Sequence, residues 1–253
     1  MKKLKEILGG IWKIYAALWF VLLLLLFYPL YLIYLKDEKS FHKALNILEF
    51  HTNVLLFVSG IIVKIENQHY LKENHNCVIT PNHTSYLDIL VLYPTIPDYF
   101  VFMGKQELQK IPIFNIFFKK MNIAVDRKSA VSGKLAMERC AKELAKGHSI
   151  VMFPEGTIPK TTPHLSNFKN GAFKLAIEQQ VPIIPITFLS NYRRLEMGGL
   201  FSGKAGPGPA RVIVHEPIPT KGMTEEDLVP LRNKVHEIIK EELIKHGRYE
   251  RNS

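Results

Sequence analysis

The chain has 253 residues, of which 47% are hydrophobic and 22% are charged, and its formal net charge is +10. This length suits one α/β domain with a full core and a short appendage, and a mean hydropathy of +0.03 argues against a wholly water-soluble domain. Because the basic residues are spread along the chain without a recognisable nucleic-acid-binding motif, the charge favours an anionic membrane surface or an acidic partner over nucleic acid.

Much of the excess apolar character lies near the N-terminus. Residues 14–35 contain no charged side chain and are long enough, as a helix, to cross a bilayer core. A cleaved signal peptide fits poorly, because the apolar run is too long and no small-x-small cleavage site follows it. A second apolar stretch, residues 41–63, is interrupted by Lys43, Glu49 and His51, which indicates a helix in the membrane interface.

Two arrangements fit this N-terminal segment: a helical hairpin that crosses and returns, and a helix pair sunk into one leaflet. Pro29 predicts a kink in the first helix. Lysines flank that helix on both sides, so the positive-inside signal is weak. We predict a membrane-associating helix pair over residues 1–62, with the remaining residues, 63–253, forming an α/β domain on the cytoplasmic side of the inner membrane.

After residue 63, short apolar runs alternate with longer amphipathic ones. The short runs are rich in β-branched and aromatic residues, which predicts strands over residues 63–66, 77–80, 99–103, 122–125, 149–153, 183–188 and 211–215. The amphipathic runs predict helices over residues 85–92, 112–120, 129–146, 167–179 and 225–245. This alternation indicates an α/β fold with a mixed, mostly parallel sheet flanked by helices.

Three smaller features complete the chain. Cys77 and Cys140 have no metal-ligand spacing, and we interpret them as buried thiols in a reducing compartment. Residues 197–209 are rich in glycine and proline and predict a mobile surface loop. Pro182 and Pro185 fall in an apolar strand, which predicts an edge or bulged strand, although core packing also explains its composition.

Residues 80–88 (TPNHTSYLD) contain a candidate catalytic pair. In one regular helix, His83 and Asp88 would point about 140° apart and would not pair. The sequence instead favours a helix that starts later, with Ser85 as N-cap and Asp88 at N3, so that His83 lies on the strand-to-helix turn. Asp88 would then orient the imidazole and leave its other nitrogen as a general base. By spacing alone, a capping aspartate beside an ordinary turn histidine is the commoner explanation.

Two further segments lie where ligands bind in α/β sheets. Residues 153–157 (FPEGT) put a carboxylate and a flexible turn at the end of a strand. Arg127 follows a strand and precedes a helix, where a phosphate would meet a guanidinium and a helix N-terminus. An ordinary strand exit and a solvated basic surface explain these two segments equally well or better when each is taken alone.

Taken in order, these segments resemble the motifs of the 1-acylglycerol-3-phosphate acyltransferase family of glycerolipid acyltransferases. The matching residues are 82–88 (NHTSYLD), Lys105 with Asp126 and Arg127, 153–157 (FPEGT) and 181–186 (VPIIPI). The resemblance implies transfer of a fatty acyl group from acyl carrier protein or coenzyme A to the sn-2 hydroxyl of lysophosphatidic acid, giving phosphatidic acid in phospholipid biosynthesis. It implies no metal, no other cofactor and no covalent enzyme intermediate.

The resemblance also implies a role for each site residue. In the His-x4-Asp motif His83 would be the base and Asp88 its orienting partner. Lys105 and Arg127 would bind the phosphate, and residues 181–186 would line the acyl side. The glycerol portion would be bound by Glu155, Gly156 and Thr157.

One departure affects the headgroup, and two other classes compete with this interpretation. The family commonly has an arginine after FPEGT, whereas this chain has Ile158. A basic residue that binds the phosphate is therefore either absent here or replaced by Lys160 or Lys169. Another acceptor, such as a lyso-ornithine lipid, therefore stays open. A metal hydrolase that uses His83 and Asp88 as ligands lacks a visible third ligand. A non-catalytic lipid-binding protein gives no reason for the pair.

Overall fold

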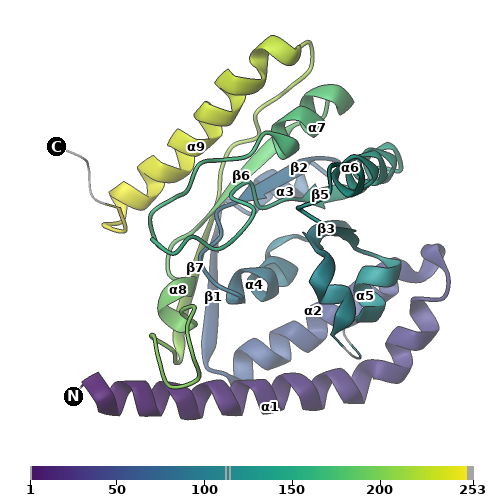
Figure 1. Ribbon diagram of the computed structural model, residues 1–253. Coiled ribbons are helices and arrows are strands. Elements are labelled where there is room, and N and C mark those ends of the chain that lie inside the picture. Colours follow the sequence, from purple (N-terminus) through teal and green to yellow (C-terminus); the bar gives the residue numbers. More distant parts are fainter. Residues whose placement is uncertain (1, 112, 114, 250–253) are drawn as a thin grey trace.

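The computed structural model describes residues 2–111, 113 and 115–249. Its centre is a seven-stranded sheet in the order β1-β7-β6-β2-β5-β3-β4 (Figure 1). Each predicted strand is present, with its ends within three residues of the prediction. The bounds are β1 Ile61–Glu66, β2 Val78–Pro81, β3 Phe100–Lys105, β4 Ile123–Val125, β5 Ser149–Val151, β6 Ile183–Phe188 and β7 Gly208–Val214.

The sheet is mixed and mostly parallel, as predicted. Strands β1 and β7 pair in parallel, and so do β6 with β2, β2 with β5, β5 with β3, and β3 with β4. Only the pairing of β6 with β7 is antiparallel among the described strands. The carboxyl ends of β6, β2, β5, β3 and β4 therefore meet at one edge of the sheet, where an α/β fold places its ligands.

The prediction that the proline-containing strand is an edge strand of the sheet is wrong. Strand β6 lies between β7 and β2, and all six of its residues are buried. The carbonyl of Pro185 accepts the backbone N–H of His215 at 3.0 Å, but the ladder to β7 begins only at Ile186. Pro185, which has no N–H, lies between the β6–β7 ladder and an isolated bridge that joins Ile183 to Ile218. The missing N–H therefore removes no hydrogen bond from the ladder.

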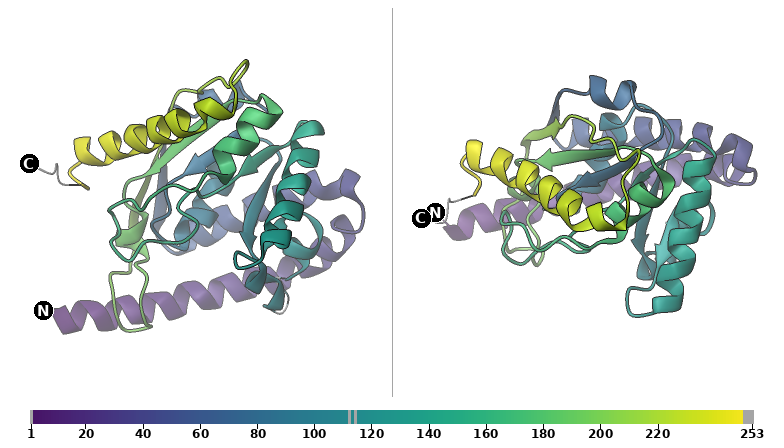
Figure 2. Two further views of the ribbon diagram at one scale, coloured as in Figure 1. Left: turned by 45° about the horizontal axis from the view of Figure 1, so that its top comes forward. Right: turned by 90° about the horizontal axis from the view of Figure 1, so that it is seen from above.

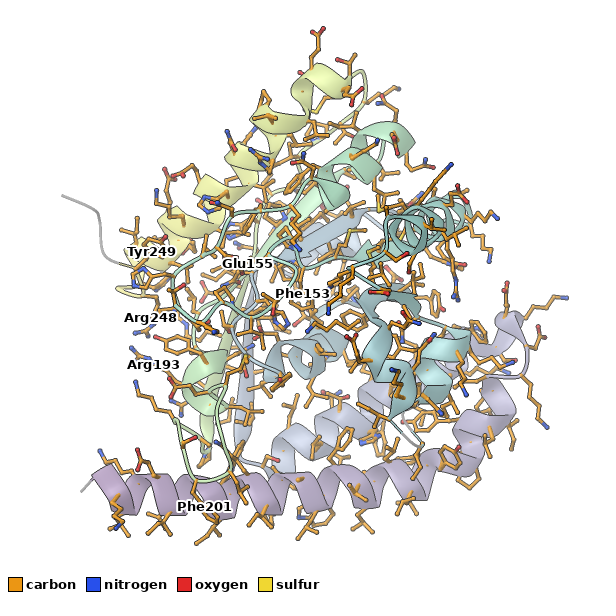
Figure 3. The ribbon with its side chains drawn as sticks, viewed as in Figure 1. Phe153, Glu155, Arg193, Phe201, Arg248 and Tyr249 are labelled. Carbon is orange, nitrogen blue, oxygen red and sulfur yellow. The ribbon has the colours of Figure 1, made fainter. Side chains whose placement is uncertain are left out.

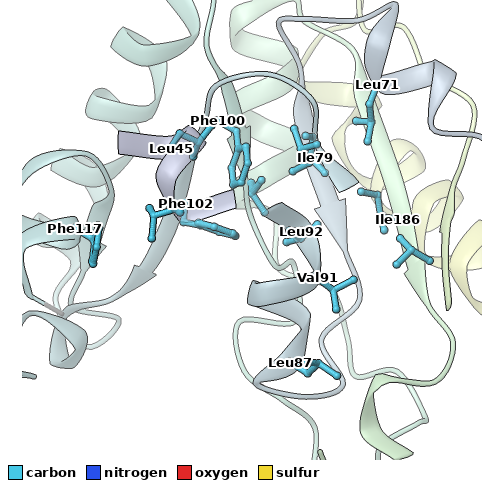
Figure 4. Close-up of a cluster of buried hydrophobic side chains, with 14 of the residues drawn as sticks. Leu45, Leu71, Ile79, Leu87, Val91, Leu92, Phe100, Phe102, Phe117 and Ile186 are labelled. Carbon is cyan, nitrogen blue, oxygen red and sulfur yellow. The ribbon is translucent and has the colours of Figure 1, made fainter. Parts of the chain in front are cut away.

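Helices cover both faces of the sheet (Figures 1 and 2). One face packs against α1 Lys2–Tyr34, α2 Phe41–Val58, α3 His69–Lys72, α4 Leu87–Thr95 and α5 Asn115–Lys120. The other packs against α6 Ala130–Ala145, α7 Gly171–Gln179 and α9 Leu228–Lys245. A further short helix, α8 Asn191–Arg194, follows β6, and the 3-10 turns are η1 Glu38–Ser40, η2 Gln106–Lys110 and η3 Glu225–Asp227. Figure 4 shows part of the first core, whose buried side chains include Ile79, Val91 and Phe100.

The predicted helices are present, although α4, α6, α7 and α9 start one to four residues later than predicted. α7 begins at Gly171 rather than at residue 167, because the backbone of Lys169 is hydrogen-bonded to Pro154. The predicted start of α5 at Pro112 lies outside the described residues. Gly147 has a φ of +88° just after α6, as a helix C-terminus requires, and Cys77 and Cys140 are buried, as predicted.

α1 runs lengthwise along the base of the domain and bends upward toward its C-terminal end, where Pro29 lies inside it, in agreement with the predicted kink (Figure 1). It is the one described helix that is apolar and long enough to cross a membrane, and its 33 residues rise roughly 50 Å. Leu24 and Tyr31 are buried on the side that packs on α2. The opposite side exposes an apolar row that includes Leu4, Ile7, Ile11, Ile14, Leu18, Val21, Leu22, Leu25, Leu26 and Ile33.

Candidate active site

The turn between β2 and α4 brings His83 and Asp88 together. His83 Nδ1 lies 3.0 Å from Asp88 Oδ2. The N-cap is Tyr86, one residue later than predicted, and α4 begins at Leu87. Ser85 still makes two capping bonds: its Oγ accepts the Leu87 N–H at 3.0 Å, and its own N–H donates to Asp88 at 2.8 Å. His83 pairs with Asp88 because it precedes the helix and folds back over its first turn.

Five donors fix the Asp88 carboxylate, which is completely buried. Oδ2 accepts from the His83 ring and from the backbone N–H groups of Thr84 and Ser85. Oδ1 accepts from the Thr84 hydroxyl at 3.0 Å and from the side-chain amide of Asn191, on α8, at 2.8 Å. The carboxylate therefore caps the helix and orients the imidazole at the same time.

The His83 ring is held on two sides. It stacks on Phe153 with ring centres 4.1 Å apart, and its side chain is 14% exposed. Because Asp88 accepts a hydrogen bond, the imidazole donates from Nδ1, which leaves a lone pair on Nε2. This arrangement suits proton abstraction from a bound hydroxyl group.

Glu155 joins the His83 turn to the loop that follows FPEGT. Figure 3 shows it close to Phe153. Its Oε1 accepts the backbone N–H of His83 at 2.7 Å, and its Oε2 accepts the N–H and hydroxyl of Ser166 at 2.8 and 3.1 Å. The side chain is 4% exposed, and burial raises the pKa of Glu155, although these hydrogen bonds oppose that shift. Both oxygens thus serve protein donors, so Glu155 holds His83 in place.

Strand register places the remaining predicted residues at the same edge. One row of paired residues crosses β2, β5 and β3: Ile79, Val151 and Phe102. His83 and Glu155 follow this row by four residues and Lys105 by three, and Lys105 pairs with Val125, two residues before Arg127. Adjacent strands lie about 4.8 Å apart, so β3 is about 10 Å from β2.

Comparisons with known proteins identify the family of the chain. An acyltransferase family model matches residues 62–189. The 1-acyl-sn-glycerol-3-phosphate acyltransferase alpha of Mus musculus is 30% identical over 223 residues, covering 86% of this chain and 74% of that protein. The chain belongs to the 1-acyl-sn-glycerol-3-phosphate acyltransferase family. It is an acyltransferase of phospholipid biosynthesis.

Two other relatives mark the extent of the likeness. A chloroplast 1-acyl-sn-glycerol-3-phosphate acyltransferase of Brassica napus is 29% identical over 207 residues, and this chain spans only 58% of its length. The crystal structure of the 1-acyl-sn-glycerophosphate (LPA) acyltransferase PlsC from Thermotoga maritima superposes with a TM-score of 0.73, covering 97% of this chain and 98% of that one at 22% identity. The acyltransferase fold therefore extends over the N-terminal helices as well.

Ile158 stands where the resemblance described in the sequence analysis implies an arginine. Ile158 is buried, so it presents no group to a ligand. Gly156 has a φ of +72°, and the Lys169 ammonium crosses it so closely that a Cβ there would lie 3.0 Å from Nζ. Since the Lys169 N–H also donates to Pro154 at 2.8 Å, the structure puts this lysine beside the FPEGT turn. Thr157, next to Gly156, is exposed.

Sequence reasoning missed Asn191 and Ser166 as parts of the acyltransferase site, and it gave no separate role to Phe153, the first residue of FPEGT. Asn191 comes three residues after β6 ends, and polar residues after a strand are a weak signal for a site. That signal becomes useful only once β6 is known to lie next to β2. Ser166 lies in a loop with no regular structure, so nothing in its local pattern singles it out.

Proposed function

We propose that this acyltransferase moves a fatty acyl group from a thioester to the sn-2 hydroxyl of lysophosphatidic acid. The observation that carries the proposal is the buried, five-donor Asp88 holding the imidazole of His83. His83 Nε2 takes the hydroxyl proton while the hydroxyl oxygen attacks the thioester carbonyl carbon. The tetrahedral intermediate then collapses, the C–S bond breaks, and the departing thiolate takes the proton back from the imidazolium, which Asp88 stabilises.

The acceptor's phosphate would meet the basic residues at the edge of the sheet. Lys105 and Arg127 supply two cations at the ends of β3 and β4, and Lys169 supplies a third beside Gly156. Gly156 and Thr157 would border the glycerol. A glycerol contact from Glu155 would have to compete with the donors that already engage both of its oxygens.

Both acyl carrier protein and coenzyme A deliver the acyl chain as the same thioester, so either donor fits this chemistry. The basic balance of the chain suits the phosphates of coenzyme A and an acidic carrier protein alike. A metal hydrolase fits less well, because residues 2–111, 113 and 115–249 contain no group of three His, Cys, Asp or Glu side chains placed to share an ion.

For the N-terminal helices, residues 1–62, we propose the arrangement in which the pair is sunk in one leaflet. α1 packs lengthwise on the domain and exposes an apolar row along its other side. A crossing helix would pull the attached catalytic domain, residues 63–253, into the bilayer core, whereas a helix in the membrane plane buries that row. The free, buried cysteines agree with the cytoplasmic face of the inner membrane.

A His83→Ala variant tests the catalytic assignment. Acyl transfer from acyl carrier protein and from coenzyme A would be measured by mass spectrometry against lysophosphatidic acid, other lysophospholipids and a lyso-ornithine lipid. We expect His83→Ala to abolish transfer and His75→Ala to keep it, since His75 also pairs with an aspartate, Asp98, but in an exposed position before β2 and β3 begin. Transfer by folded His83→Ala protein contradicts the proposal. A product from another lysolipid alone would reassign the acceptor, and lysolipid binding without thiol release would identify a binding protein.

A further inference from the structure

Residues 195–205 form a hairpin that reaches from the active site to α1. A bridge between Leu195 and Ala205 closes its base. Its tip exposes three large apolar side chains within five residues: Met197, Leu200 and Phe201, which are 46%, 47% and 53% exposed. Single exposed apolar residues are normal on a soluble surface, but a cluster of this kind marks a contact site.

The hairpin tip is docked on α1. The ammonium of Lys13 donates to the carbonyls of Gly199 and Ser202 at 2.9 and 2.7 Å. The ring of Phe201 fills the space beside Gly10, where a Cβ would overlap a ring carbon. Figure 3 shows Phe201 at α1. Ala205, at the base of the hairpin, lies against Gly9 of α1, and a cavity of about 770 Å³ is lined by residues of both segments.

This docking makes the hairpin tip continuous with the apolar row of α1. Ile11 and Ile14, which directly follow Gly10 and Lys13 in α1, are 55% and 42% exposed. Lys13 is drawn to the hairpin carbonyls, so its charge does not interrupt the row. A lipid leaflet is the partner that would cover the long apolar row of α1 and the hairpin tip together.

The base of the hairpin is bonded to the catalytic turn. The carbonyl of Leu195 accepts the hydroxyl of Ser85 at 2.6 Å, and Ser85 in turn donates its N–H to Asp88. Asn191, four residues before Leu195, donates directly to Asp88. One short segment therefore touches both the membrane helix and the carboxylate that orients His83.

We propose that residues 195–205 are a third membrane-contacting element, which inserts its tip into the same leaflet as α1 and holds the Ser85–Asp88 turn while it is docked. The membrane role of α1 and the role of His83 are taken from the proposed function. Release of the tip from α1 loosens the Leu195 carbonyl from Ser85 and so lowers turnover. The geometry thus links lipid contact to the catalytic pair.

Site-directed fluorescence tests the lipid contact. Both native cysteines are buried, so a cysteine at position 200 is labelled selectively with an environment-sensitive dye. We expect the full-length L200C protein to be quenched by brominated lipid in vesicles of equal parts phosphatidylcholine and phosphatidylglycerol. V229C is the matched control, because Val229 has the same 47% exposure but lies on α9, across the sheet from α1. Equal behaviour of the two positions overturns the lipid contact.

Turnover of a water-soluble, short-chain acceptor tests the link to the catalytic pair. Gly10→Ala displaces Phe201, and we expect kcat to fall about two- to tenfold, the effect of losing one neutral hydrogen bond. Gly133→Ala makes the same change in α6, where a Cβ meets open space, and should leave kcat unchanged. Lys13→Met undocks the tip without added bulk. Wild-type kcat in both Gly10→Ala and Lys13→Met overturns the link. Because the quenching experiment needs no turnover, failure of the proposed reaction would be seen separately.

Discussion

Replacing Asn191 by alanine removes one of the five donors on Asp88 and leaves the other four in place. The Asn191 amide is fully buried and donates to Oδ1 at 2.8 Å. A hydrogen bond to a carboxylate contributes about 1.5–3 kcal/mol, which corresponds to roughly a 10- to 150-fold change in rate if all of it acts in the transition state. Because four donors still hold the carboxylate, we expect the lower end of this range, a kcat about tenfold below wild type.

Initial rates over a range of lysophosphatidic acid concentrations separate kcat from KM. KM should be unchanged, because Asn191 contacts Asp88 and takes no part in acceptor binding. The matched control is Asn122→Ala: Asn122 is also buried, and its side chain accepts the Phe102 N–H at 2.9 Å, away from the catalytic turn. A wild-type kcat in folded Asn191→Ala, or an equal loss in Asn122→Ala, would refute the reasoning.

Three further predictions follow from single side chains. Glu155→Gln should lower kcat about tenfold and leave the acceptor KM unchanged, because Glu155 positions His83; a rise in KM alone would instead assign it to glycerol binding. Lys169→Gln should raise the KM for lysophosphatidic acid, whereas Lys160→Gln, on the same loop, should not, and equal KM values would remove Lys169 from the phosphate site. Burial lowers the pKa of His215 from 6.5 to about 4. Between these two pKa values the unfolded chain binds a proton at His215 that the folded chain does not. The free energy of unfolding therefore falls by about 3 kcal/mol as the pH drops from 6.5 to about 4. Urea unfolding in detergent should show that the stability of His215→Gln depends less on pH than that of the wild type. Equal slopes of stability against pH in the two proteins would contradict this prediction.

Local sequence patterns determined the positions of the secondary-structure elements and of the catalytic pair. Strand and helix positions were predictable because alternation and helical periodicity record which side chains face a core. The pairing of His83 with Asp88 was also predictable, since both lie within one strand-to-helix turn whose capping signals sit between them. The FPEGT turn and the apolar first helix were also predictable, because each is defined by residues that are close together in the chain.

Contacts between distant segments were decided only by the tertiary structure. Asn191 reaches Asp88 across 103 residues, and Glu155 reaches the His83 backbone across 72, because strand order puts β6 and β5 on either side of β2. The same order makes β6 an interior strand despite Pro185, whose missing N–H falls in a gap of the ladder. No local pattern encodes which strands become neighbours, since the sheet pairs backbone groups that every residue except proline carries.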